Sequence, residues 1–278
     1  MNDERPKLGA IDPPPMEITE PDDPRVAAFR SIRERDLVGR EGRFIAEGKV
    51  VLDVLLSAGR FPVESILILE NRLAGLRATL ERAPRETQVY TASAAVMDAI
   101  AGFHIHRGIL ALGRRRHDET ADALLGNLAK DALVVVLVGI ANHDNAGAIF
   151  RNAAAFGADA VLLDSTSCDP LYRKATRVSV GATLKVPFAR GENITGLLDA
   201  LHRHGFTPVA LSPRGEADIR EMRRPDRVAL FLGTEGDGLP HALMDKMVTA
   251  RIAMAPGFDS LNVATAAAIA LHELWEKR

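Results

Sequence analysis

Residues 133–151 of this 278-residue chain have the sequence LVVVLVGIANHDNAGAIFR. The run LVVVLVGI is apolar apart from one glycine, which is typical of a parallel strand that is covered on both faces. Polar residues at 142–145 follow as a turn, and the small residues of 146–156 favour a helix that Gly157 ends at a C′ position. A strand, a turn and a helix in this order indicate an α/β fold.

The same alternation of strands and helices continues toward the C-terminus. Further strands are predicted at 160–163, 208–211, 228–232 and 251–254, and helices at 171–180, 194–203, 242–247 and 261–275. The second half of the chain is therefore predicted to be a mostly parallel sheet with helices on both sides.

The first half of the chain predicts a smaller α/β unit. Short apolar runs predict strands at 44–46, 65–69, 88–90 and 108–112, and helical spacing predicts helices at 30–40, 50–58, 73–82 and 94–101.

These elements divide the chain into four segments. Residues 1–24 hold six prolines and a net charge of -5, which predicts a flexible acidic tail. A small domain is expected at 25–113, a polar linker at 114–131 and a C-terminal domain at 132–278.

The composition excludes several classes of protein. Hydrophobic residues make up 47% of the chain and charged residues 26%, as in ordinary globular proteins. The longest apolar run, 132–141, is far shorter than the ~18–20 residues that a bilayer requires. The N-terminus lacks the apolar stretch of a secretion signal, and a single cysteine, Cys168, excludes an internal disulfide and a multi-cysteine metal site. We expect a cytoplasmic protein that binds neither a membrane nor a metal.

Basic residues are concentrated in the first half. Residues 25–116 hold 16 Lys and Arg against 10 Asp and Glu, a net charge of +6, although the whole chain has a net charge of -2. This surplus is compatible with a polyanionic partner and also with an ordinary solvated surface.

Three polar segments follow predicted strands, and the first begins at Asn142. Asn145 and Gly147 are expected at a helix N-terminus, where Asn145 either caps the helix or holds a ligand. Arg151 follows about two turns later. An ordinary turn with a capping asparagine and a surface arginine would have the same pattern.

The second segment, residues 232–240, has the sequence LGTEGDGLP. Its three glycines permit close approach of the backbone to a ligand and positive φ angles. The Lys-Ser/Thr pair of a P-loop is missing, and Glu235 and Asp237 would repel a phosphate. A ligand with a hydroxyl or a positive charge is favoured, and a simple tight turn is the alternative.

The third segment, residues 252–264, has the sequence IAMAPGFDSLNVA and leads into an alanine-rich helix. Asp259 or Ser260 is expected to cap this helix. Capping explains only one of the polar residues, so Ser260 and Asn262 together indicate a site.

Together the three segments resemble the SpoU-type RNA 2′-O-ribose methyltransferases, the TrmH family of the SPOUT superfamily. The first resembles the family motif N-x-G-A-x-x-R, the second L-G-x-E-G-x-G-L and the third S-L-N-V-A. The segment RKATRVSVGA at 173–182 also resembles the family. RFIAEG at 43–48 resembles the start of a ribosomal-protein-like substrate-binding domain that is often fused to it.

The resemblance implies an S-adenosylmethionine-dependent enzyme that works as a homodimer. It implies a parallel-sheet C-terminal domain with a deep trefoil knot, preceded by a small α/β domain that binds RNA. Elementary physics does not predict the knot, because threaded connections are nearly absent from proteins. The implied cofactor-binding residues are Leu211, Gly233, Thr234, Glu235, Gly236, Ile252, Met254, Ser260, Leu261 and Asn262, and the implied catalytic residues are Arg151, Asn145, Ser260, Asn262 and Glu235.

In the implied reaction, a ribose 2′-hydroxyl attacks the methyl group of a sulfonium. This hydroxyl must be held in line and must lose its proton. A guanidinium group stays protonated because its pKa lies above ~12, so we expect Arg151 to anchor a phosphate or to lower the hydroxyl pKa by its charge. Asn145, Ser260 and Asn262 are expected to orient the hydroxyl and the cofactor, and Glu235 to hold Asn145 or Arg151 in place.

The expected substrate is structured RNA, with 23S ribosomal RNA preferred because the added domain resembles a ribosomal protein. Transfer RNA is the alternative within the same chemistry, and an inactive RNA-binding or ribosome-assembly module is the alternative of another class. His104 and His106 lie in the basic half without a third metal ligand and are expected to be solvated or to contact RNA.

Overall fold

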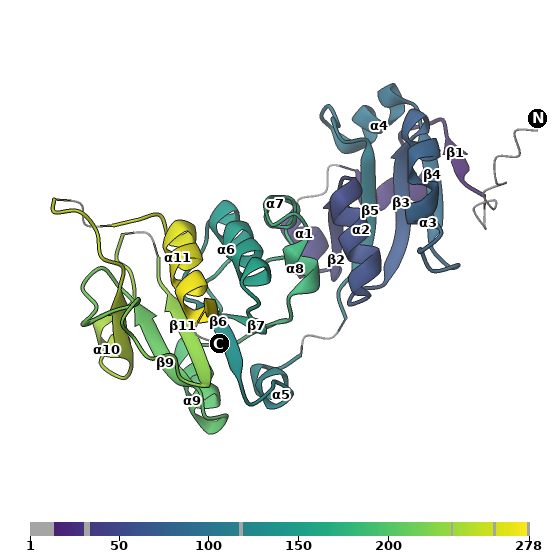
Figure 1. The fold of residues 1–278 in the computed structure, drawn as a ribbon. Coiled ribbons are helices and arrows are strands. Elements are labelled where there is room, and N and C mark those ends of the chain that lie inside the picture. Colours follow the sequence, from purple (N-terminus) through teal and green to yellow (C-terminus); the bar gives the residue numbers. More distant parts are fainter. Residues whose placement is uncertain (1–13, 31–33, 117–118, 235, 258–259, 277–278) are drawn as a thin grey trace, which may run out of the picture. The chain divides into compact units, whose positions relative to one another are not determined.

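The computed structural model describes residues 14–30, 34–116, 119–234, 236–257 and 260–276 (Figure 1). They form two compact units that divide after residue 116, with residues 171–173 grouped with the first. Within the described residues, no helix is both long and apolar enough to cross a membrane.

The second unit is built on a sheet of seven parallel strands. Their order across the sheet is β10-β12-β9-β11-β6-β7-β8. The strands are β6 (Ala132–Leu137), β7 (Ala160–Leu163), β8 (Phe188–Arg190), β9 (Thr207–Leu211), β10 (Ala217–Asp218), β11 (Arg227–Leu232) and β12 (Val248–Arg251). The chain forms β9 before β11, yet β11 lies between β6 and β9.

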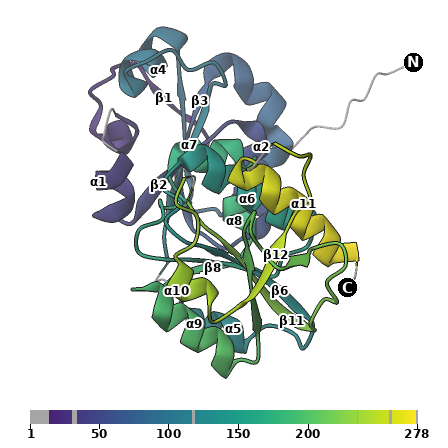
Figure 2. The same ribbon diagram turned by 90° about the vertical axis from the view of Figure 1, so that its left-hand side faces the viewer.

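Helices cover both faces of this sheet (Figure 2). One face carries α6 (His143–Ala155), α8 (Ala182–Lys185) and α11 (Val263–Glu276), and α7 (Arg173–Val178) precedes α8. The other face carries α5 (Ala121–Gly126), α9 (Ile194–Arg203) and α10 (His241–Met244). Alternate residues of β6 enter the two cores, Leu133 and Val135 on the α6 side and Val134 and Val136 on the α9 side. The apolar run of β6 is therefore buried on both faces, as predicted.

Two helices far apart in the sequence, α6 and α11, are joined by a hydrogen bond. The Asn152 side chain donates its Nδ2 to the carbonyl oxygen of Ala264 at 2.8 Å. This contact fixes the start of α11 against the last turn of α6.

Several predicted elements of the second unit differ from the structure. The strand expected at 251–254 is β12 at Val248–Arg251, because its ladder with β9 ends where Ala250 meets Leu211. The expected linker 114–131 contains α5, whose Leu124 and Leu125 are buried against α9. The helices expected at 171–180 and 242–247 are shorter, and β8, β10 and α8 were not predicted.

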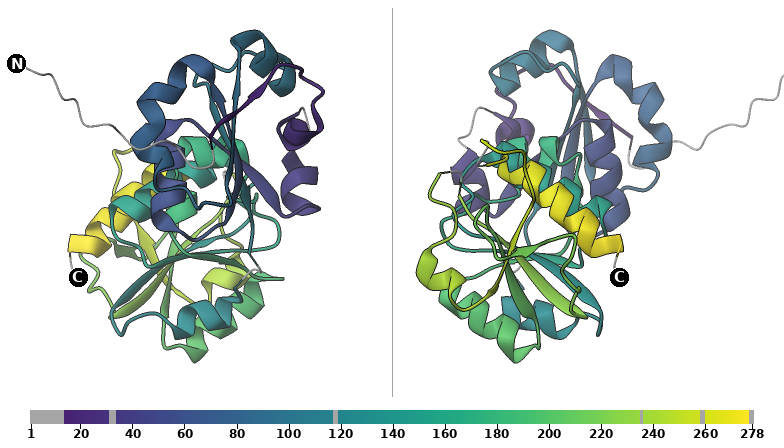
Figure 3. Two further views of the ribbon diagram at one scale, coloured as in Figure 1. Left: turned by 90° about the vertical axis from the view of Figure 1, so that its right-hand side faces the viewer. Right: turned by 60° about the vertical axis from the view of Figure 1, so that its left-hand side comes forward.

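The first unit has a mixed sheet in the order β1-β4-β3-β5-β2. Its strands are β1 (Met16–Ile18), β2 (Arg43–Glu47), β3 (Val63–Leu69), β4 (Gln88–Ala92) and β5 (Ile109–Arg114). Its helices are α1 (Glu34–Gly39), α2 (Lys49–Ala58), α3 (Arg77–Leu80) and α4 (Ala94–Ala101), with 3₁₀ turns at Pro24–Phe29 and Glu70–Leu76. Figure 3 shows α2 and α3 on one side of this sheet and α1 and α4 on the other.

The prediction of a flexible tail over residues 1–24 is wrong from residue 16 onward. Met16–Ile18 pair in parallel with β4, and Ile18 is buried in the core on the α4 side. A three-residue strand has too little alternation to be recognised from the sequence, and it exists because β4 offers it an edge. Residues 1–13 lie outside the described residues. The helix expected at 73–82 is instead a 3₁₀ turn that leads into α3, and Gly75 at the junction disfavours a continuous helix.

Two glycines within helices provide a matched prediction about packing. A Cβ on Gly147 of α6 would lie 2.6 Å from the carbonyl oxygen of Ala175 and 3.0 Å from the Cβ of Val178. We expect Gly147→Ala to lower the free energy of unfolding by about 1–3 kcal/mol, because the backbone of α7 cannot move aside cheaply.

On Gly196 of α9 the nearest atom would be the Oδ1 of Asn193 at 3.5 Å, an ordinary contact. Gly196→Ala is expected to stabilise the chain by about 0.5 kcal/mol, since alanine favours the helix. Urea denaturation of both variants tests the pair, and equal effects would contradict this packing argument.

Candidate active site

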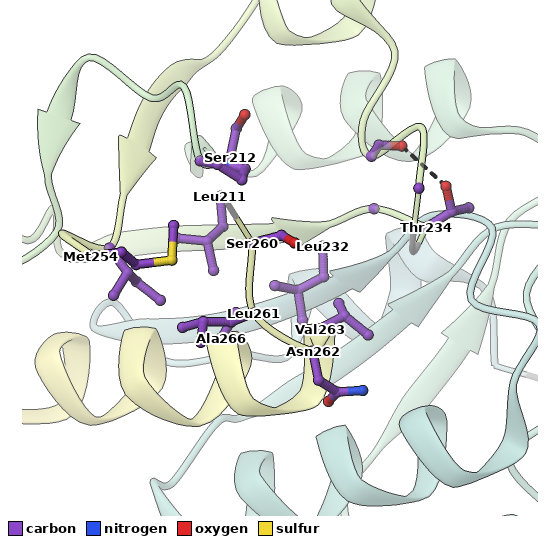
Figure 4. Close-up of a pocket in the computed structure, with 15 residues that line it drawn as sticks. Leu211, Ser212, Leu232, Thr234, Met254, Ser260, Leu261, Asn262, Val263 and Ala266 are labelled. Carbon is purple, nitrogen blue, oxygen red and sulfur yellow. Dashed lines mark hydrogen bonds between the residues drawn. The ribbon is translucent and has the colours of Figure 1, made fainter. Parts of the chain in front are cut away.

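A cavity of about 450 Å³ lies at the carboxyl ends of β9, β11 and β12 (Figure 4). Ligands of parallel α/β sheets bind at this edge. Three segments form its wall: the residues after β9, the glycine loop after β11, and the chain from Ile252 to the first turn of α11. The lining residues are Leu211, Ser212, Pro213, Leu232, Gly233, Thr234, Gly236, Gly238, Ile252, Met254, Ser260, Leu261, Asn262, Val263 and Ala266.

Nine of the ten residues expected to bind a cofactor line this cavity, and the tenth, Glu235, lies outside the described residues. The sequence prediction missed Ser212, Pro213, Leu232, Gly238, Val263 and Ala266. Ser212 and Pro213 directly follow the strand predicted at 208–211, so the rule that ligands bind at carboxyl ends would have found them.

The described wall of the cavity has no formal charge. Figure 4 shows Leu211, Met254, Leu261 and Ala266 gathered on one side, while Ser212 and Thr234 bring hydroxyl groups. A phosphate group would meet no cation on this described wall, whereas a flat ring with an apolar face and a polar edge fits it.

The glycine loop is tightly closed on itself. A Cβ on Gly233 would lie 2.5 Å from the backbone carbon of Gly238 and 2.5 Å from the nitrogen of Leu239. Thr234 pairs with Gly238, and its hydroxyl donates to the Gly238 carbonyl at 3.5 Å. Gly236 has a φ of +111°, and a Cβ added to it would meet open space. Glycine is required at position 233 because the backbone of the loop leaves no room for a Cβ. At position 236 it is required because φ is positive there.

Asn145 and Asn262, from segments 117 residues apart, form a direct hydrogen bond. The Nδ2 of Asn262 donates to the Oδ1 of Asn145 at 3.0 Å. The Oδ1 of Asn262 accepts from the backbone nitrogens of Ala264 at 2.9 Å and Thr265 at 3.2 Å, so Asn262 caps α11. The cap was expected at Asp259 or Ser260, but Asn262 stands closer to the helix and takes this role, and Asp259 lies outside the described residues.

A smaller cavity of about 240 Å³ adjoins the first and contains Asn145. It is lined by Gly139, Ile140, Ala141, Asn142 and Asn145, and it shares Thr234 and Val263 with the larger cavity. The helix cap of α6 is Asn142, which accepts from the nitrogen of Asp144 at 2.8 Å. Asn145 therefore does not cap α6 and is instead a buried wall residue.

Arg151 is separated from these groups. It is exposed on α6, lines neither cavity, and has no hydrogen-bond or ion-pair partner within the described residues. Arg151 follows Asn145 by six residues, and on an α-helix this spacing places the two side chains about 120° apart around the helix axis. The structure brings Asn145, Ser260 and Asn262 to the cavities but leaves Arg151 outside them.

Charged side chains occur in a third cavity of about 450 Å³. It shares Ser212 and Ser260 with the first cavity and adds Arg214, Asp237 and His241. A ligand that extended from the first cavity and carried both a positive and a negative group would meet charges of both signs here.

Asp164, which directly follows β7, holds in place the turn after β6 that lines the smaller cavity. Its carboxylate accepts from the nitrogen of Gly139 at 3.1 Å, from the nitrogen and hydroxyl of Ser167, and from the hydroxyl of Thr166. Burial alone would raise the pKa of Asp164, but the hydrogen bonds from Ser167, Thr166 and Gly139 outweigh it, so the pKa lies below its usual value. Arg190 donates to the carbonyls of Asp164 and Ser167, each at 2.9 Å, and completes the network.

Asp164→Ala is expected to lower the free energy of unfolding at pH 7 by about 2–3 kcal/mol, because it leaves buried donors unpaired. The lowered pKa makes this contribution complete above the unfolded-state value of about 3.9 and lost as the pH falls below it. The difference between the native chain and the variant should therefore shrink between about pH 5 and pH 2. Denaturation across this range measures it, with the exposed Asp199→Ala as control; a difference that is constant with pH would contradict the assignment.

Other candidate groups do not form a site. Burial raises the pKa of the Cys168 thiol to about 11, so it is not a ready nucleophile. Within the described ranges, no three His, Cys, Asp or Glu side chains gather as metal ligands.

An open parallel sheet with a cavity at its carboxyl edge defines a class of α/β proteins that bind a small organic molecule there. Residues 132–272 match the model of the SpoU rRNA Methylase family. The chain is 40% identical over 267 residues to a tRNA/rRNA methyltransferase of Mycobacterium bovis described as uncharacterised, which covers 93% of this chain and 91% of that protein. It is 31% identical over 211 residues to the 23S rRNA (guanosine-2′-O-)-methyltransferase RlmB of Neisseria meningitidis, over 74% of this chain and 83% of that protein.

Solved structures agree with this comparison. A crystal structure of an RNA 2′-O ribose methyltransferase matches 94% of this chain and 99% of its own, with a TM-score of 0.77 and 29% identity. An AdoMet-bound rRNA methyltransferase of Sinorhizobium meliloti has the same fold, with a TM-score of 0.80 over 94% of this chain and 97% of its own, at 24% identity. The chain belongs to the SpoU rRNA Methylase family.

Proposed function

We propose that this chain transfers a methyl group from S-adenosylmethionine to a ribose 2′-hydroxyl of structured RNA, with 23S ribosomal RNA as the preferred substrate. The observation that carries the proposal is the hydrogen bond between Asn145 and Asn262, made where the larger cavity meets the smaller one. The names of RlmB and of the RNA 2′-O ribose methyltransferase support the type of reaction.

The larger cavity fits the cofactor by its chemistry. Its apolar walls suit the faces of an adenine ring, and the hydroxyls of Ser212, Thr234 and Ser260 suit its polar edge. Arg214 and Asp237 in the adjoining cavity suit the charged amino-acid end. When bound, the cofactor supplies an activated methyl group.

The protein's own residues would position the hydroxyl. Asn145 faces the smaller cavity and is held by Asn262, so its amide is oriented before the substrate arrives. Arg151 would hold a phosphate of the same nucleotide and place positive charge near the hydroxyl as it loses its proton. Ser260 and Glu235 complete the proposed catalytic set.

A homodimer with a trefoil knot in each copy is part of the proposal. Arg151 does not reach the cavities of its own chain, so a second copy would have to bring it to them. The exposed Ile269 and Trp275 of α11 offer an apolar contact between copies.

The basic segment 25–116 would grip the RNA through salt-dependent phosphate contacts. The four-segment division is kept as a proposal, with α5 assigned to the methyltransferase domain and β1 to the RNA-binding one. An RNA substrate of this kind would place the enzyme in the cytoplasm.

The test is methyl transfer from radiolabelled S-adenosylmethionine to ribosomal and transfer RNA from cells that lack this protein. Label in an alkali-resistant dinucleotide of 23S RNA would support the proposal, because a methylated 2′-oxygen cannot attack the neighbouring phosphate. Label in transfer RNA would establish the alternative substrate. No label and no cofactor binding by calorimetry would leave an RNA-binding module.

A further inference from the structure

The loop between α4 and β5 in the first unit exposes aromatic side chains. Its residues 103–107 have the sequence FHIHR, in which Ile105 is buried and anchors the loop while the other four residues are exposed. Phe103 is 43% exposed, although phenylalanine is usually buried in folded proteins. The guanidinium of Arg173, which is grouped with the same unit, lies over the Phe103 ring at 4.6 Å from its centroid, so a base would stack on the opposite face.

The rings of this loop are held in place. Asp98 of α4 accepts from the nitrogen of Ile105 at 2.9 Å and contacts the Nδ1 of His104 at 2.7 Å. The rings of His104 and His106 meet edge to face, with centroids 4.6 Å apart. Because the loop is ordered before any partner arrives, binding to it would cost little conformational entropy.

An arginine, Arg107, lies at the other end of the loop. It extends across the start of α2, where a Cβ on Gly48 would be 2.8 Å from its Cδ. Within the described residues Arg107 has no ion pair. Lys49, the residue after Gly48, by contrast pairs with Asp53 at 2.7 Å. Asp98 also contacts the loop, but its carboxylate is already engaged by His104.

We propose that the loop 103–107 is a stacking site for an unpaired RNA base, with the Phe103 ring as the platform and Arg107 as the contact to the flanking phosphate. Bases in a duplex are hidden in the stack, whereas bases in loops and bulges stack on exposed aromatic rings. Duplex RNA would use the phosphate contact alone. The inference rests on the proposed function only in taking RNA as the partner.

The test compares the affinity of the full chain for two labelled probes, an oligoadenylate of about twelve nucleotides and an RNA duplex of about 16 base pairs. Phe103→Ala is expected to weaken binding of the oligoadenylate by about 5- to 100-fold and to change duplex binding less than about twofold. Phe103→Leu, which keeps the apolar volume without the ring, should behave like Phe103→Ala. Phe103→Trp, which keeps an aromatic ring, should bind the oligoadenylate as tightly as the native chain.

Arg85→Ala is the matched control, because Arg85 is an exposed arginine of the same unit without a partner among the described residues. It should weaken both probes equally and slightly. Unchanged oligoadenylate binding by Phe103→Ala, equal losses on both probes, or a leucine variant that binds like the native chain would each overturn the stacking site. Calorimetry with S-adenosylmethionine separates the two proposals: absent cofactor binding with a selective loss in Phe103→Ala would refute the methyltransferase and leave the stacking site standing.

Discussion

Replacing Arg151 by alanine is expected to reduce methyl transfer by at least about 100-fold, the range found when a group that stabilises developing charge is removed. Binding of S-adenosylmethionine should stay within about twofold, because Arg151 lines neither cavity. The fold should also be unaffected, since the side chain is exposed and has no partner within the described residues. Single-turnover kinetics and calorimetry measure the two effects separately.

Two further variants sharpen this test. Arg151→Lys keeps the charge but loses the planar fork that holds a phosphate, so it should recover only part of the rate. Arg223→Ala removes another exposed arginine of the same unit and should leave the rate unchanged. A near-normal rate in Arg151→Ala would remove this residue from the mechanism, and a loss of cofactor binding would show that it acts through the cavity.

Gly233→Ala is expected to weaken S-adenosylmethionine binding by about 10- to 100-fold, which corresponds to about 1–3 kcal/mol of overpacking. The added Cβ would lie 2.5 Å from backbone atoms of Gly238 and Leu239, which cannot rotate away as a side chain can. The loop would have to open, and with it the wall of the cavity.

The control for Gly233 is Gly75→Ala, where a Cβ would meet no atom within 4 Å. This variant should bind the cofactor like the native chain. Titration calorimetry measures both variants, and circular dichroism verifies that they are folded. Native affinity in Gly233→Ala would mean that the loop does not form the cofactor site.

Elements with strong local signals could be predicted closely from the sequence. The predicted bounds of β7, α4 and α9 coincide with those in the structure. Both helices begin after a capping side chain, Ser93 for α4 and Asn193 for α9, and end near a glycine. Such signals lie within a few residues of each other, so they can be recognised without knowledge of the fold.

Short elements could not be predicted, because they depend on partners elsewhere in the chain. β1, β8 and β10 have two or three residues each and exist through pairing with β4, β7 and β12. The offset of β12 has the same origin. Its ladder with β9 ends at Ala250 and its pairing with β10 ends at Arg251, so Ile252 and Met254 lie beyond the strand and line the cavity.

The sequence by itself determined which residue types follow each strand, and hence the three segments that form the site. Only the tertiary structure decided which of their side chains meet. Local periodicity is set by neighbouring residues, but the contact between Asn145 and Asn262 spans 117 positions. It arises because α11 returns to pack on α6. Arg151 follows Asn145 by six residues, so the rotation of the helix that points Asn145 inward points Arg151 outward to solvent.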